Sequence, residues 1–106
     1  MSRRDQLESL LAEEPGDIFL RYAIAMECKK EGNAEEAVSR MRELTVADPP
    51  HVPAFFMAAQ YLTELGEIAS ARTLLREGIE HARQQGDQHA AGEMSEYLQT
   101  LGELGE

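Results

Sequence analysis

Apolar residues recur three and four positions apart along most of the chain, and glycine or proline interrupts them at short intervals. This spacing places apolar side chains on one face of an amphipathic α-helix, whereas strict alternation would indicate a β-strand. The pattern predicts six helices, separated by breaks at Pro15–Gly16, Gly32, Asp48–Pro50, Gly66 and Gln84–Gly86. The residues expected to face inward are Leu7, Leu10 and Leu11; Leu20, Ile24, Ala25 and Cys28; Ala37, Val38, Met41 and Leu44; Phe55, Ala58, Ala59 and Leu62; Ala71, Leu74, Leu75 and Ile79; and Ala91, Met94, Leu98 and Leu101.

Helix start signals agree with these breaks. Asp17 is expected to cap the second helix, and Asn33 with Glu36 has the spacing of a capping box for the third. Pro53 suits the first turn of the fourth helix, because that position needs no N–H donor. The joints are short and polar, so consecutive helices should be antiparallel neighbours, and the expected fold class is all-α.

The chain also matches itself at a spacing of 34 residues. Gly32 is followed by Gly66 (66 − 32 = 34), and the pairs Ala37 and Ala71, Ala25 and Ala59, and Pro15 and Pro49 have the same separation. Such a period predicts stacked copies of one helical hairpin. We expect a single domain over 1–106, made of a half repeat (1–15), two repeats (18–51 and 52–85) and a C-terminal capping helix (86–106). The register slips by two residues near Arg83–Gly86, where the expected proline is missing.

These positions resemble the tetratricopeptide repeat (TPR) family. The resemblance rests on small residues in each first helix, glycine at each hairpin turn, alanine then a large apolar residue in each second helix, and a closing proline. In this chain they are Ala25 and Ala59, Gly32 and Gly66, Ala37 and Ala71, Met41 and Leu75, and Pro49. The chain departs from the family at four positions: Arg21 and Phe55 stand where the family often has Trp, and Cys28 and Leu62 stand where it often has Tyr. The resemblance implies a right-handed superhelix of antiparallel hairpins and a small stand-alone scaffold or adaptor.

TPR proteins usually bind a peptide or a partner helix on the concave face formed by the first helix of each repeat. Carried over to this chain, the resemblance implies peptide binding by Phe19, Tyr22, Met26, Lys29, Lys30, Phe56, Gln60 and His89. The alternative is that Phe19, Tyr22 and Phe56 fill the seam between helices. Lys29 and Lys30 would hold an acidic flank of the partner, or would be cations at an ordinary helix C-terminus. The residues of a carboxylate clamp are missing.

Composition narrows the classes of partner. Twenty acidic and ten basic side chains give a net charge of −10, which disfavours nucleic acid and anionic membrane surfaces. No Lys or Arg follows Arg83, so the C-terminal segment, with Glu103 and Glu106 at its end, is either a solubilising cap or a patch that attracts a basic partner. The single cysteine, Cys28, allows no internal disulfide and is expected to be buried. Without an apolar run of membrane-span length or a signal peptide, we expect a cytoplasmic location.

Nothing in the chain indicates an enzyme, a cofactor or a metal site. His51, His81 and His89 are scattered, and the Glu77–His81 pair supplies two ligands at most. No Gly-rich phosphate loop or nucleophile motif is present. The leading hypothesis is a non-catalytic protein-binding module. The alternative is self-assembly, such as a homodimer, in which the incomplete end repeats of two chains complete each other through Leu7, Leu11, Met94, Tyr97 and Leu101.

Overall fold

The computed structural model describes residues 2–105, with side chains as far as Gly102, and consists of six helices over that range. They are α1 (Arg3–Glu13), α2 (Ile18–Lys30), α3 (Ala34–Thr45), α4 (Val52–Glu64), α5 (Ile68–Gln84) and α6 (Gln88–Gly105). The predicted all-α class is confirmed. The acidic side chains of Glu103 and Glu106 lie outside the described residues.

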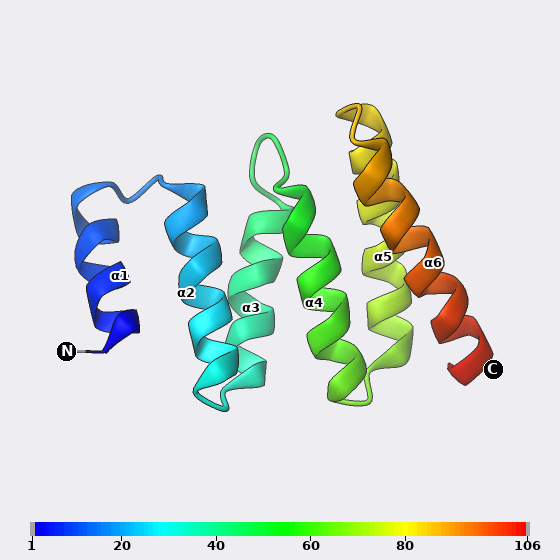
Figure 1. Cartoon of the computed structure of the whole chain (residues 1–106), viewed down its shortest axis with the longest axis horizontal. Helices are drawn as coiled ribbons and strands as arrows, with labels where there is room; N and C mark the ends of the chain where they lie inside the picture. Colours follow the sequence, from blue (N-terminus) through cyan, green and yellow to red (C-terminus); the bar gives the residue numbers. More distant parts are fainter. Residues whose placement is uncertain (1, 106) are drawn as a thin grey trace.

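The helices stand side by side in chain order, and the two termini lie at opposite ends of the array (Figure 1). Each helix packs on the next along the chain, and α4 also touches α6. In the view of Figure 1, α4 and α6 lie in front of α3 and α5, so the array has two layers. The molecule is accordingly long and flat, 43 × 31 × 18 Å.

The two side-chain caps that the sequence predicted are present at the starts of α2 and α3. Asp17 Oδ1 accepts a hydrogen bond from the Leu20 N–H at 3.0 Å, as expected. Asn33 Oδ1 accepts from the Glu36 N–H at 3.2 Å, but the predicted capping box is only half formed. The Glu36 carboxylate accepts from the side-chain amide of Asn33, because the Asn33 backbone N–H already donates to the Cys28 carbonyl at 2.9 Å.

Three of the helix ends share one turn. Gly32, Gly66 and Gly86 have φ of +88°, +82° and +78°, in the left-handed region that glycine enters without a Cβ penalty. After each glycine, the next N–H donates to the carbonyl five residues back, for example from Asp87 to Ala82 at 2.8 Å. This is the Schellman arrangement, which satisfies the last carbonyls of a helix. The joint between α5 and α6 has no proline, and Gly86 ends α5 there with the same turn.

The core is one cluster of buried side chains that runs through all six helices and combines alanines with larger apolar residues. The largest fully buried side chains are Phe55, Ile24, Met41, Leu44, Leu75, Met94, Leu101 and Cys28. Three expectations of burial were too strong and one was wrong: Leu11, Leu20 and Leu98 are only half-buried, and Leu10 is 50% exposed. Leu10 lies on the end helix α1, which packs mainly on α2 and buries only Leu7.

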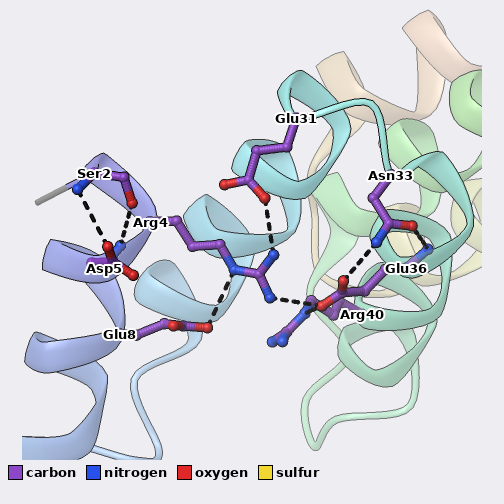
Figure 2. A network of polar contacts seen from close by, with 8 residues as sticks. All are labelled: Ser2, Arg4, Asp5, Glu8, Glu31, Asn33, Glu36 and Arg40. Atoms are coloured by element: carbon purple, nitrogen blue, oxygen red, sulfur yellow. Dashed lines mark hydrogen bonds and ion pairs between the residues drawn. The ribbon is translucent and has the colours of Figure 1, made fainter.

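Charged side chains add to the docking of α1. The Arg4 guanidinium meets the carboxylates of Glu8 (3.3 Å), Glu31 (3.0 Å) and Glu36 (2.8 Å), so it joins α1 to the end of α2 and to α3 (Figure 2). Arg40 Nε lies 2.8 Å from the same Glu36 carboxylate. Hydrogen bonding to Glu31 raises the pKa of Arg4, and hydrogen bonding from Arg40 lowers the pKa of Glu36. A capping box between Ser2 and Asp5, which the pattern did not predict, opens α1.

Candidate functional site

A groove lies where the first helices of successive hairpins meet. A hollow of about 260 Å³ is bordered by Tyr22 of α2, by the first turns of α4 and by the first half of α6. A second hollow of about 290 Å³ continues it along α4 and α6 and shares Phe56 and Glu93 with it. We call the two together the α4–α6 groove. Its lining residues are Tyr22, Val52, Pro53, Phe56, Met57, Asp87, His89, Ala90, Glu93, Met94, Glu96, Tyr97 and Thr100.

The floor of the groove is mostly apolar and is held by ring contacts. Phe56 of α4 packs on Tyr97 of α6, with ring centroids 5.5 Å apart and a tilt of 54°. Both rings are half-buried, so each supports the other and still presents a surface to the groove. Aromatic pairs of this kind are worth about 0.5–1.5 kcal/mol beyond the area that they bury. The floor is therefore formed before any partner arrives.

At the start of α4, next to the groove residue Tyr22, the His51 ring contacts two aromatic rings. Its ring lies edge-on to Tyr22 at 5.0 Å and to Phe19 at 5.9 Å. Burial lowers the pKa of His51 and raises that of Tyr22, which favours the neutral form of both. Phe19 is 77% exposed and therefore does not fill a seam between helices. It lines a separate hollow with Pro49 and His51.

The predicted lysines are already engaged within the chain. Lys29 Nζ lies 3.2 Å from the Glu64 carboxylate and 5.5 Å from the centre of the Tyr61 ring. Burial raises the pKa of Tyr61 to about 12. Lys30 Nζ lies 3.5 Å from the Glu27 carboxylate. Both lysines are in the last turn of α2, where cations also interact favourably with the helix dipole.

The structure thus brings together some of the predicted binding residues and leaves others apart. Tyr22, Phe56 and His89 line the α4–α6 groove. His89 is exposed, with Nε2 3.5 Å from the Glu93 carboxylate. Met26 and Gln60 are half-buried and do not line it.

The predicted packing residues occupy the interior and the turns. Six of them have no exposed surface: Ala25, Ala37, Met41, Ala59, Ala71 and Leu75. Gly32 and Gly66 form the turns described above. Pro49 is exposed in the joint between α3 and α4.

Several residues of this region were not among the predicted binding residues, and His51 and Ala90 are two of them. His51 occupies the position equivalent to Asp17 (51 − 34 = 17) and, with the two-residue slip, to Asp87 (87 − 36 = 51). Both aspartates cap their helices with the side chain, whereas His51 makes no cap hydrogen bond and turns its ring toward Tyr22. The sequence feature that could have drawn attention to His51 is a histidine at a position where the other repeats have a capping aspartate. Ala90 lines the groove because it is small and leaves space there.

A larger hollow of about 380 Å³ lies between α3 and the turn from α4 to α5. Four of its seven lining residues are polar or charged, and the charges have both signs: Glu35, Arg42, Glu67 and Ser70, against Val38, Leu62 and Leu65. Ligand sites on proteins are usually apolar clefts with a few polar groups. The α4–α6 groove fits that description better.

Comparison with known proteins decides the family. A tetratricopeptide repeat domain protein of Salinibacter ruber, solved by NMR, is 31% identical and superposes with a TM-score of 0.77, over 82% of this chain and 88% of that one. A crystal structure of a tetratricopeptide repeat domain protein from the same organism gives 31% identity and a TM-score of 0.76, over 83% of this chain and 98% of that one. The chain belongs to the tetratricopeptide repeat family.

Two further comparisons add a similar sequence and a similar fold. A TPR repeat-containing protein of Pseudomonas aeruginosa is 26% identical over 95 residues, which cover 90% of either chain. A protein of Bordetella parapertussis, 23% identical, superposes with a TM-score of 0.81 over 97% of this chain and 90% of that one, which shows the shared fold. No family model matches the sequence.

Other kinds of site are not formed by the part of the chain that the structure describes. Within it, no three His, Cys, Asp or Glu side chains gather closely enough to hold a metal ion. None of its helices has the length and apolar character needed to cross a membrane. TPR proteins generally act as non-catalytic scaffolds, so membership of the family points to protein partners.

Proposed function

We propose that this TPR chain is a non-catalytic adaptor that binds a peptide or a partner helix in the α4–α6 groove. The observation that carries the proposal is the half-buried aromatic floor, in which Tyr22 and Phe56 are held by His51 and Tyr97. Aromatic side chains in partly enclosed positions are the residue type that most often dominates binding energy at protein interfaces.

The groove suits binding because its walls are held in place by the fold. Phe56 and Tyr97 come from two helices that pack on α5, so a partner gains apolar contact without ordering the receptor. The cost of ordering side chains at an interface, about 0.5–1.5 kcal/mol for each flexible one, is then borne mainly by the partner. This supports a site for an extended or helical segment.

The test is to change Tyr22 and Phe56 to Ala together and to measure capture of partner segments from a displayed peptide library. We expect binding to be lost while circular dichroism still reports a helical chain. Leu65→Ala together with Val46→Ala is the matched control, because these exposed apolar side chains lie outside the groove. If the double variant loses helicity, Ala90→Gln replaces it, since it adds bulk to the groove and removes no packed ring. Unchanged capture by the folded variants would contradict the proposal.

Self-assembly remains the second candidate, favoured by the half-exposed Leu10 on the end helix α1. Of the five residues first considered for it, Leu7, Met94 and Leu101 are covered by the chain's own helices, and Leu11 and Tyr97 are half-buried. A homodimer formed through the end helix α1 would therefore use Leu10 rather than Leu7. Sedimentation as a monomer of 11.8 kDa at all concentrations would remove this candidate.

A further inference from the structure

One side of the α4–α6 groove is lined with carboxylates. Asp87 stands ahead of α6, and Glu93 and Glu96 follow on that helix; all three are exposed and line the groove. No Lys or Arg occurs in the sequence after Arg83, so α6 offers these carboxylates no cation of its own. The rim of the groove on the α6 side is therefore acidic.

The carboxylates of this rim have no lysine or arginine partner in the described structure. Glu93 meets only the His89 ring, and the Asp87 carboxylate accepts the Ala90 N–H as a helix cap. Some other carboxylates are paired with cations, for example that of Glu36, which meets Arg4 and Arg40. The rim thus combines like charges beside an apolar floor without an internal counter-charge.

We propose that the groove selects a partner segment that carries Lys or Arg beside its apolar residues. This inference rests on the proposed function and adds the charge of the partner. Complementary charge raises the rate of encounter and disfavours partners of the same sign, while the apolar floor supplies affinity. The preference is opposite to the acidic flank expected from Lys29 and Lys30, because Glu64 and Glu27 already engage those lysines.

The acidic rim and the negative net charge of the chain disfavour two other occupants of the groove, nucleic acid and a second copy of the chain. Nucleic acid would bring phosphates to an acidic rim on a chain of net charge −10. A second copy of the chain would bring the same net charge, and its N-terminal Arg3 and Arg4 are paired with Glu27, Glu8, Glu31 and Glu36. A basic, apolar segment of another protein is the occupant that the rim and the floor favour together.

The experiment selects binders to the full chain from a displayed library of random 16-residue peptides and measures the affinity of the enriched sequences. We expect these to carry net positive charge together with large apolar residues. Their affinity should fall about five- to tenfold in Glu93→Gln with Glu96→Gln, as for two partly exposed ion pairs. The control is Glu35→Gln with Glu43→Gln, which removes the same charge from exposed positions on α3 and should change the affinity less than about twofold.

The outcomes separate this inference from the proposed function. Neutral or acidic binders that depend on Tyr22 and Phe56 would overturn the inference and keep the groove as the site. Equal losses in the two glutamine pairs would also overturn it, because the effect would then follow net charge alone. Binders that ignore the Tyr22→Ala and Phe56→Ala changes, or a library that yields no binder at all, would overturn both.

Discussion

Gly78 marks a close approach of α5 to its two neighbours, α4 and α6. A Cβ built on it would lie 2.6 Å from Phe55 Cβ and 2.7 Å from Met94 Sδ, so α5 passes between α4 and α6 only because this residue has no side chain. The position is fully interior to the array, next to the helices that form the groove. In the sequence it is an isolated glycine within a helical pattern, and nothing local distinguishes it from an unfavourable helix residue.

We predict that Gly78→Ala destabilises the fold by about 1–3 kcal/mol, as overpacking usually does, even though Ala is the better helix former by about 1 kcal/mol. Chemical unfolding followed by circular dichroism measures this. Gly92→Ala is the matched control on α6, where no atom lies within 4 Å of the new Cβ. That change should raise stability by about 0.5–1 kcal/mol. Stabilisation by both substitutions would contradict the close packing.

The His51 ring predicts a pH dependence of stability. Burial holds the pKa of folded His51 below its ordinary 6.5, so at mildly acidic pH the unfolded chain binds this proton more readily than the folded chain. The neutral His51 ring therefore contributes fully to the free energy of unfolding above pH 6.5, and this contribution is lost as pH falls through the pKa of the folded chain. Stability measured between about pH 7.5 and 5 should fall more in the wild type than in His51→Gln. His89→Gln is the control, since its ring is 87% exposed; an identical pH profile for wild type and His51→Gln would exclude this role.

At the scale of the element, α1 is held differently from the other helices. It buries only Leu7, while the Arg4 guanidinium joins it to Glu31 and Glu36 (Figure 2). We predict that Arg4→Gln, or high salt, speeds hydrogen exchange of the α1 amides and leaves α4 and α5 protected. Arg3→Gln is the control, because Arg3 is 65% exposed and meets one carboxylate, that of Glu27. Equal exchange in both variants would show that apolar packing alone docks α1.

The helices themselves were predictable because their signals are local. Apolar spacing, the Asp17 cap and the glycines at the turns depend on residues a few positions apart, and the structure begins and ends its helices at those signals. The half-formed box at Asn33 was not predicted, because it depends on contacts of the assembled turn: the Asn33 N–H donates to the Cys28 carbonyl, and the Glu36 carboxylate also meets Arg4 and Arg40. The exposure of Leu10 has the same origin: periodicity gives the face of a helix, but the neighbour that covers it comes from the assembled array.

At the scale of the whole molecule, the period of 34 residues led to the family, and the comparisons bear that out. The resemblance also implied that the first helices of successive hairpins share a face. It did not reveal which of their residues line a hollow, because that depends on how α4 and α6 tilt against each other and on small residues such as Ala90. Nor did it show that Lys29 and Lys30 are paired within the chain, since Glu64 lies one repeat away from Lys29.

The central claim is that partners bind along the α4–α6 groove. The most direct measurement is a nitrogen-15 NMR titration of the full chain with the tightest peptide from the displayed library. Chemical-shift changes are expected to gather at Tyr22, on α4 around Phe56 and on α6 from His89 to Tyr97. Changes gathered instead around Val38, Leu62 and Leu65, or on α1, would contradict the account.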